Sequence, residues 1–252
     1  MAGPSDLFDL TGRVALVTGG SRGLGAEMVR AFAAAGADVV IASRKADACA
    51  ELAAEVTRDT GRRALAHACH VGRWDELDGL LAATYDEYGK LDVLVNNAGL
   101  SPLYDRPVDI SEALWDKVLD VNLKGPFRLS ALAGTRMAQA GGGSIINVSS
   151  VAAVRPGPDV IPYAAAKAGL NAITVAFAHA FGPAVRVNCI MAGPFLTDIS
   201  RAWQAETREA LGRLALGRAG NPPEIIGTAL YLASDASSFT TGAVIPVDGG
   251  TP

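Results

Sequence analysis

Short runs rich in β-branched residues alternate with longer alanine- and leucine-rich stretches along this 252-residue chain. This alternation constrains the fold most, because strand–helix repeats of this kind build a parallel sheet with helices packed on it. The first such run, Arg13–Thr18 (RVALVT), is mostly apolar, as expected for a strand that is buried on both faces. We therefore predict the α/β class: a single doubly wound, Rossmann-like domain over residues 1–252, with a seven-stranded parallel sheet and helices on both faces.

The same pattern gives the bounds of the expected elements. The other expected strands are Asp38–Ala42, Ala64–Ala68, Leu91–Val95, Ser144–Val148, Val185–Ile190 and Ala243–Val247. The expected helices are Gly23–Ala35, Ala46–Thr60, Arg73–Tyr88, Ser111–Val121, Lys124–Gln139, Pro162–Phe181 and Pro222–Leu232. No linker rich in proline, glycine or serine divides the chain, which favours one domain.

Composition and charge exclude several classes of protein. Half of the residues are hydrophobic and 19% are charged, which is typical of a globular chain. The formal net charge is -4 and no basic run occurs, so we expect no nucleic-acid partner. No apolar run is long enough to span a membrane, and Met1–Leu10 lacks the apolar middle of a signal peptide.

Cysteine and histidine usage bears on compartment and metal binding. His67 and His70 are spaced like metal ligands, but no carboxylate or cysteine cluster completes a site, so we predict no metal. The three cysteines lie far apart in apolar stretches: Cys49, Cys69 and Cys189. We therefore expect their thiols to be buried, and we expect the protein to be soluble and cytoplasmic.

A glycine-rich turn, Thr18-Gly19-Gly20-Ser21-Arg22-Gly23-Leu24-Gly25, joins the first expected strand to the first expected helix. Glycine lets the backbone approach a ligand closely, and a helix N-terminus offers unpaired N–H groups and a favourable dipole to phosphate. A glycine-rich turn alone is also common as a purely structural feature. Its place between a strand and a helix favours a loop that binds a dinucleotide.

The end of the second expected strand bears on the choice of dinucleotide. NAD sites usually carry an acid there for the ribose 2′-hydroxyl, whereas NADP sites offer positive charge to the 2′-phosphate. The strand here ends Ala42-Ser43-Arg44-Lys45, without an acid, and Arg22 in the glycine turn is placed to reach the same phosphate. We predict NADP(H); the alternative is that Arg44 and Lys45 merely begin a solvated helix.

Tyr163 and Lys167 lie four residues apart at the start of a long expected helix, a spacing that puts both on one face. A lysine ammonium near a tyrosine stabilises the phenolate and brings its pKa closer to the range useful for acid–base catalysis. The same spacing also occurs in ordinary helices that carry a surface lysine.

Other polar residues are expected at the same edge of the sheet. Ser149 and Ser150 end the fifth strand and Asn96-Asn97-Ala98-Gly99 ends the fourth, at the carboxyl edge where ligands bind in open α/β sheets. Asn122 lies in a helical stretch although asparagine is a mediocre helix former, which indicates a functional reason or a local kink.

Together these motifs resemble the short-chain dehydrogenase/reductase family in its compact single-domain form, over nearly the whole chain. The chain is similar to the 3-oxoacyl-[acyl-carrier-protein] reductase-like members of this family. The cofactor loop of the family is resembled by Thr18, Gly19, Gly23 and Gly25, and its NNAG segment by Asn96–Gly99. Its catalytic tetrad is resembled by Asn122, Ser150, Tyr163 and Lys167, where Ser150 is preferred to Ser149 because of its spacing from the tyrosine.

The resemblance implies a mechanism. Tyr163 would protonate a carbonyl oxygen while nicotinamide delivers hydride to the carbon, and Ser150 would polarise that carbonyl. Lys167 would lower the pKa of the tyrosine and bind the nicotinamide ribose, and Asn122 would hold a water that links Lys167 to solvent. The implied cofactor contacts are Gly19, Ser21, Arg22, Gly23, Leu24, Gly25, Ser43, Arg44, His70, Val71, Asn97, Ala98, Gly99, Tyr163, Lys167, Gly193, Pro194 and Thr197.

Two departures from the family pattern stand out. The family usually has an aspartate after the third strand that bonds the adenine ring, whereas this chain has His70-Val71. The adenine contact would then come from His70 or only from the Val71 backbone. The family's Pro-Gly turn appears here as Ala192-Gly193-Pro194, with Thr197 where the family often contacts the nicotinamide amide. We expect a small geometric change rather than a loss of activity.

The segment over about 195–220 resembles the family's substrate lid, although a plain amphipathic helix pair fits it equally. Its apolar residues indicate a partly hydrophobic small-molecule substrate: Phe195, Leu196, Ile199 and Trp203. Arg155 either meets an anionic substrate or is a solvated loop residue. The final strand, followed by Asp248-Gly249-Gly250, resembles the family's tetramer-forming end, so a homotetramer is expected by analogy.

The sequence leaves three functions open. The preferred one is an NADPH-dependent reductase of a ketone or 3-oxoacyl thioester. The second is an NAD(P)-dependent dehydrogenase of a sugar, polyol or other alcohol, in which the same tyrosine acts as base. The third is a dinucleotide-binding regulator without turnover, which is disfavoured because all four tetrad residues are present.

Overall fold

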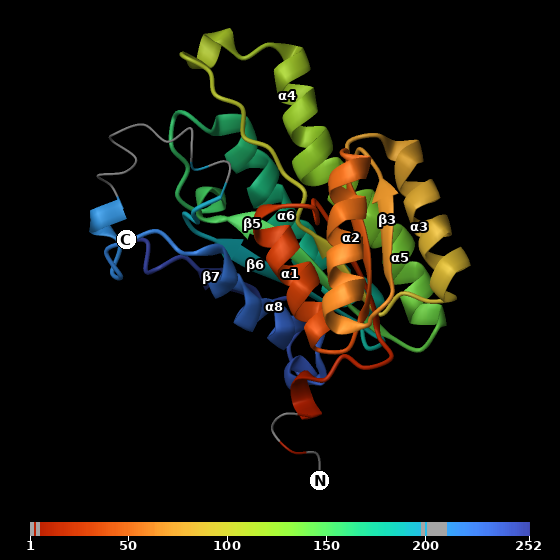
Figure 1. Ribbon diagram of the computed structural model, residues 1–252. Coiled ribbons are helices and arrows are strands. Elements are labelled where there is room, and N and C mark those ends of the chain that lie inside the picture. The colour runs from red at the N-terminus through yellow and green to blue at the C-terminus, as the bar shows by residue number, and fades with distance from the viewer. Residues whose placement is uncertain (1–2, 4–5, 198–199, 201–210) are drawn as a thin grey trace.

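The computed structural model describes residues 3, 6–197, 200 and 211–252. Its strands form one sheet in the order β3-β2-β1-β4-β5-β6-β7, and every neighbouring pair is parallel (Figure 1). The predicted α/β, Rossmann-like fold is therefore confirmed. The strands are β1 (Val14–Thr18), β2 (Asp38–Ser43), β3 (Ala64–Ala68), β4 (Val93–Asn96), β5 (Gly143–Ser150), β6 (Val185–Ala192) and β7 (Val244–Val247).

Helices cover both faces of the sheet, which explains why its strands are so apolar. Along β1, Ala15 and Val17 join the core under α1, α2 and α8, whereas Val14 and Leu16 join the core under α3, α5 and α6. The helices are α1 (Gly23–Ala34), α2 (Ala46–Thr60), α3 (Trp74–Tyr88), α4 (Glu112–Leu119), α5 (Gly125–Gln139), α6 (Ile161–Phe181) and α8 (Ile226–Ala233).

Several element bounds differ from those expected, and three of the differences change how the chain is organised. The two helices expected over 111–139 are not separated, because a π-helical turn at Asp120–Lys124 joins α4 to α5. The helix expected over Pro222–Leu232 starts as a 3-10 turn, Pro222–Ile225, where an Asn221–Glu224 capping box and two prolines set the first turn. Strand β5 continues to Ser150, so both candidate serines lie on the strand.

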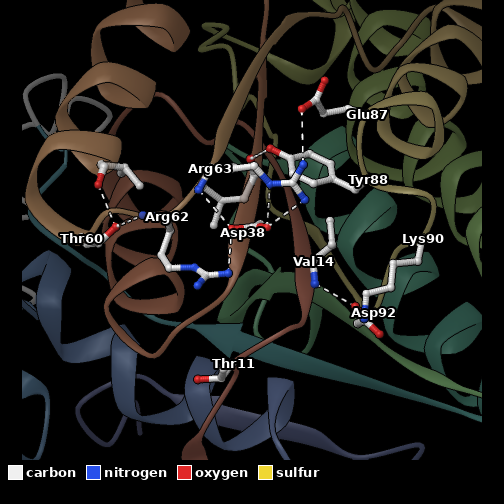
Figure 2. Close-up of polar contacts among 12 residues, drawn as sticks. Thr11, Val14, Asp38, Thr60, Arg62, Arg63, Glu87, Tyr88, Lys90 and Asp92 are labelled. Carbon is white, nitrogen blue, oxygen red and sulfur yellow. Dashed lines mark hydrogen bonds and ion pairs between the residues drawn. The ribbon is translucent and has the colours of Figure 1, made fainter.

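Carboxylates fix the amino-terminal edge of the sheet (Figure 2). Asp92 accepts a hydrogen bond from the Val14 N–H at the start of β1, with Oδ2 2.7 Å from the nitrogen. Asp38, at the start of β2, accepts the backbone N–H of Arg63 at 3.0 Å. Its two oxygens also pair with the guanidinium groups of Arg62 at 2.9 Å and Arg63 at 3.1 Å. These contacts hold the edge of the sheet opposite to the one where the strands end.

The cysteines are buried and free, as the sequence predicts: Cys49, Cys69 and Cys189. Burial raises the pKa of the Cys69 thiol to about 12 and that of Cys189 to about 11, so both are protonated at neutral pH. No helix among the described residues has the length and apolar character needed to cross a membrane. An isolated parallel β-bridge pairs Phe195 with Gly220, near the two ends of the expected lid. Two of the apolar residues expected in that lid, Ile199 and Trp203, lie outside the described residues.

Candidate active site

A cavity of about 790 Å³ lies at the carboxyl-terminal edge of the sheet, where the segments that follow all seven strands meet. This is the edge where open α/β sheets bind ligands. Of the site residues predicted from the sequence, all except Gly25 and Asn122 line this cavity. Its further lining residues are Val121, Val160 and residues in the segments 43–48, 69–71, 97–101, 148–152, 192–197, 211–214 and 251–252.

The glycine turn has the geometry of a phosphate cradle. Gly19 and Gly23 have φ values of +62° and +54°, in the left-handed region that favours glycine. A β-carbon on Gly25 would lie 2.2 Å from the Gly19 carbonyl oxygen, so this glycine supports the loop from behind. The N-cap residue of α1, Arg22, makes no side-chain capping hydrogen bond. The first turn of α1 therefore presents backbone N–H groups suited to an anionic ligand.

The tip of β2 gives the cavity a positive end. The Ser21 hydroxyl donates to the Ser43 hydroxyl at 2.9 Å, which joins the glycine turn to the end of β2. Arg22, Arg44 and Lys45 line the cavity there, and none of its described lining residues is aspartate or glutamate. Arg44 is exposed and forms no ion pair with the described residues. This end fits a phosphate and offers no carboxylate to a ribose hydroxyl.

Strand β5 and helix α6 bring three of the predicted catalytic residues together. Lys167 Nζ lies 5.6 Å from the centre of the Tyr163 ring and donates to the Val148 carbonyl at 2.7 Å. Ser150 and Tyr163 both line the cavity, where the nearby Ser150 hydroxyl acts to lower the pKa of the phenol. The neighbouring Ser149 instead donates to the Lys167 carbonyl at 3.2 Å, which ties β5 to α6. Ser149 is thus used in the contact between β5 and α6, and the preference for Ser150 as the partner of the tyrosine stays a prediction.

Burial controls the protonation of this group. Burial raises the pKa of Tyr163, and the nearby Ser150 hydroxyl offsets part of that rise. It lowers the pKa of Lys167 to about 8, because an ammonium group loses its hydration there. The resemblance implies that Lys167 lowers the pKa of Tyr163; in the protein alone, burial outweighs any such lowering, and the pKa stays above its ordinary value. The loss of solvent outweighs other effects on the phenol, while the ammonium group bonds the Val148 carbonyl.

Asn122 lies behind the cavity in the π-helical turn, fully buried. Its amide nitrogen donates to the carbonyls of Leu100 at 2.8 Å and Val118 at 2.9 Å, and its oxygen accepts the Leu100 N–H at 3.3 Å. The kink indicated by asparagine in a helix is therefore present. The side chain fastens the segment after β4, and its two N–H donors are both used by backbone.

The departures from the family pattern also lie at the cavity. The His70 ring nitrogen Nδ1 accepts the backbone N–H of Gly72 at 3.2 Å. The backbone N–H of His70 donates to the Glu76 carboxylate at 2.6 Å. Val71 lines the cavity beside it, as do Gly193, Pro194 and Thr197 after β6. Arg155 is not among the described lining residues. Within the described ranges, no three His, Cys, Asp or Glu residues are grouped as a metal site.

Several lining residues have no place among the predicted site residues. Leu100 and Ser101 directly follow the Asn96–Gly99 motif, and extending that motif along the chain would have found them. Other lining residues carry no local signal, because tertiary contacts bring them to the cavity: Leu211, Arg213, Leu214, Thr251 and Pro252. Thr251 and Pro252 follow a turn that pairs with the segment after Arg213, since the Ala215 N–H donates to the Gly250 carbonyl at 3.1 Å.

Comparison with known proteins identifies the family. The model of the family described as Enoyl-(Acyl carrier protein) reductase matches residues 19–252. Human "Dehydrogenase/reductase SDR family member 4" is 35% identical over 247 residues, which cover 96% of this chain and 88% of that protein. The chain belongs to the short-chain dehydrogenase/reductase family. As a short-chain dehydrogenase/reductase it is an oxidoreductase that uses a nicotinamide dinucleotide and acts on alcohol or carbonyl groups.

Two solved members of the family have closely similar structures. The NADPH-dependent 3-quinuclidinone reductase of Rhodotorula rubra superposes with a TM-score of 0.93 at 30% identity, covering 100% of this chain and 97% of that chain. A 7α-hydroxysteroid dehydrogenase complexed with NADH and 7-oxo glycochenodeoxycholic acid has a TM-score of 0.94 at 32% identity, covering 100% and 98%. The family fold thus accommodates both dinucleotides, and the choice rests on the residues of each chain.

Proposed function

We propose that this short-chain dehydrogenase/reductase is an NADPH-dependent reductase of a ketone or 3-oxoacyl thioester, with Tyr163 as the general acid. The observation that carries the proposal is the placement of Ser150 and Lys167 with Tyr163 in one cavity that has a cationic end. When bound, the dinucleotide supplies the hydride that reduces the carbonyl carbon. The protein must then supply a proton to the carbonyl oxygen.

The three side chains divide this work. Tyr163 is protonated at neutral pH, since burial raises its pKa, and its hydroxyl is therefore able to donate to the developing alkoxide. Ser150 lines the cavity with the tyrosine and offers a hydroxyl to the substrate oxygen. Lys167 keeps a positive charge below about pH 8 and stabilises the phenolate that forms when Tyr163 gives up its proton.

The preference for NADPH rests on the tip of β2. Ser43 ends the strand and is bonded to Ser21, so no carboxylate is offered to a 2′-hydroxyl at this point. Arg22 and Arg44 flank the same corner of the cavity. A guanidinium group donates two hydrogen bonds to a phosphate at once, which favours the 2′-phosphate of NADPH.

Apolar residues support a substrate with a partly hydrophobic body. The wall of the cavity includes Leu100, Val151, Val160, Phe195 and Leu214. We propose that the segment over about 195–220 acts as the lid of one domain spanning residues 1–252. Oxidation of an alcohol by the same site is the reverse reaction, and the dinucleotide preference discriminates between the two directions in cells.

Assembly and location belong to the same proposal. We propose a cytoplasmic homotetramer. Phe239 is fully exposed and β7 is an edge strand, so association there would cover apolar surface and an open edge. Three buried free thiols are consistent with a reducing compartment. Sedimentation equilibrium of the purified protein tests the tetramer.

The decisive experiment is a fluorescence titration with NADPH and NADH of the wild type, Arg44→Ala and Arg58→Ala. Arg58 is a matched control, because it is an exposed arginine of α2 paired with Asp59. We expect Arg44→Ala to weaken NADPH binding roughly 10- to 100-fold, as for the loss of a charged hydrogen bond, and to leave NADH binding unchanged. A wild type that binds NADH as tightly as NADPH would overturn the cofactor assignment and favour an alcohol dehydrogenase. Absence of turnover with a ketone panel would favour a regulator.

A further inference from the structure

Tyr104 joins two loops that border the cavity. Its hydroxyl donates to the carbonyl of Pro158 at 2.7 Å and accepts the N–H of Ile161 at 2.7 Å. Tyr104 lies in the segment after β4, whereas Pro158 and Ile161 lie at the end of the loop that connects β5 to α6. One oxygen therefore connects segments more than fifty residues apart in sequence.

The bond to Ile161 caps a helix that would otherwise lack a cap. Helix α6 begins at Ile161, and its N-cap residue, Val160, makes no side-chain capping hydrogen bond. Helix N-termini leave backbone N–H groups without partners, and the next residue, Pro162, has none to offer. Tyr104 supplies the missing acceptor from outside the helix. This cap lies two residues before Tyr163.

The segment that carries Tyr104 is fastened at its other end too. Asn122 binds both the N–H and the carbonyl of Leu100, so the chain from Leu100 to Tyr104 runs between the π-helical turn and the start of α6. Leu100 and Ser101 line the cavity on this segment, and Val160 lines it on the facing loop. The Tyr104 hydroxyl thus holds two walls of the cavity together next to the proposed acid.

We propose that Tyr104 is a positioning residue, which fixes the first turn of α6 and the separation of the two loops so that Tyr163 faces the substrate carbonyl. This inference rests on the proposed reductase function. Small displacements at a reacting centre lower the rate sharply, because hydride and proton transfer need a defined approach. The proposed phosphate contacts of the cofactor lie at the glycine turn and the tip of β2, away from this contact, so we expect the NADPH affinity to depend little on Tyr104.

The test compares Tyr104→Phe with Tyr231→Phe. Phenylalanine keeps the ring and removes both hydrogen bonds of Tyr104. Tyr231, in α8, is the matched control. Its hydroxyl forms a hydrogen bond with the Thr240 hydroxyl at 2.7 Å, and the residue does not line the cavity. The measurements are the NADPH Kd, the single-turnover rate of NADPH oxidation with a ketone that the wild type reduces, and hydrogen exchange of the Ile161 amide.

We expect Tyr104→Phe to lower the single-turnover rate constant roughly 10-fold, with an NADPH Kd within about 2-fold of the wild type. The Ile161 amide exchanges faster in this variant, whereas Tyr231→Phe matches the wild type in all three measurements. If Tyr104 only stabilises the fold, fewer molecules of the variant are folded, and the amplitude of the single turnover falls. The rate constant of the folded molecules then stays unchanged. That result overturns the proposal.

Failure of the reductase function is distinguishable from failure of this inference. If the wild type reduces no ketone, the proposed function fails, and the exchange of Ile161 still reports whether Tyr104 holds α6. An unchanged exchange rate in Tyr104→Phe overturns the role of Tyr104 even in an active enzyme.

Discussion

Lys167 Nζ lies 5.6 Å from the centre of the Tyr163 ring, and both residues lie on the carboxyl side of β5 in the first turns of α6. The Lys167 side chain is buried and donates to the Val148 carbonyl, so its charge is held inside the protein near the phenol. Burial lowers the pKa of the lysine to about 8 and raises that of the tyrosine. The site therefore keeps a cation ready for the phenolate, and this buried charge lowers the stability of the fold.

The pH dependence of stability should reveal this buried charge. Below about pH 8 the folded protein and the unfolded chain both hold the lysine proton, and above 10.5, the ordinary pKa, neither does. Between these values only the unfolded chain binds it, so the free energy of unfolding rises with pH. We expect the wild type to gain on the order of 2 kcal/mol relative to Lys167→Met between pH 7 and pH 10.

Urea unfolding at both pH values measures this difference. Lys117→Met is the control, since Lys117 is an exposed residue of α4 and should follow the wild type at both pH values. Parallel pH profiles for the wild type and Lys167→Met would show that the lysine keeps its ordinary pKa in the fold.

Removal of the proposed acid should abolish turnover and spare binding. Tyr163→Phe keeps the ring that lies near Lys167 and loses the hydroxyl that is proposed to protonate the substrate. We expect kcat for ketone reduction to fall about 10²- to 10⁴-fold, the usual contribution of a general acid, with the NADPH Kd within a few-fold. Steady-state kinetics with Tyr231→Phe as control checks this. A variant that keeps a tenth of the activity would exclude Tyr163 as the acid.

The sequence predicts the parts of this site that follow strands directly. Gly19, Ser43, Asn97 and Ser150 each come at or just after the end of a strand, so the parallel sheet alone brings them to one edge. It does not predict Thr251, which reaches the cavity through pairing with the lid. Nor does it predict the upward shift in the pKa of Tyr163, because burial is a property of the folded environment.

The same distinction applies to Asn122 and Tyr104. The poor helix propensity of asparagine indicates a kink, and the π-helical turn is there, yet the partner of the amide, Leu100, is a backbone group with no sequence signature. Likewise, nothing in a loop tyrosine reveals that its hydroxyl caps a helix that begins 57 residues later.

The glycine turn gives a test of the cofactor site that is independent of catalysis. A β-carbon at Gly25 would lie 2.2 Å from the Gly19 carbonyl oxygen and 2.6 Å from Asn97 Nδ2. Backbone cannot yield at such distances without moving the loop, so Gly25→Ala should weaken NADPH binding by at least about 10-fold. Gly79→Ala is the control, because a β-carbon there meets nothing within 4 Å in α3. The control should bind NADPH normally and unfold at a slightly higher temperature, since alanine favours a helix. Equal Kd values for Gly25→Ala and the wild type would contradict the cradle.

The opposite edge of the sheet offers the converse test, in which stability changes and binding does not. Asp38 has an 11% exposed side chain that accepts the Arg63 N–H and pairs with Arg62 and Arg63. Asp38→Ala leaves that N–H and two cations without their carboxylate. We expect a loss of about 1–3 kcal/mol in the free energy of unfolding, moderated because both arginines are partly exposed.

Asp109→Ala is the control for Asp38→Ala, because it measures how much stability is lost when an exposed ion pair is removed. Asp109 pairs with Arg106 at 2.8 Å on the surface, so its removal should change the stability by less than about 1 kcal/mol. Urea unfolding gives both values, and the NADPH Kd of each variant, measured where it is fully folded, should equal that of the wild type. The Asp38 cluster lies at the strand starts, whereas the cavity lies where the strands end. A higher NADPH Kd in Asp38→Ala, but not in Asp109→Ala, would mean that a change at the strand starts is transmitted to the cavity. The two edges of the sheet would then not be independent.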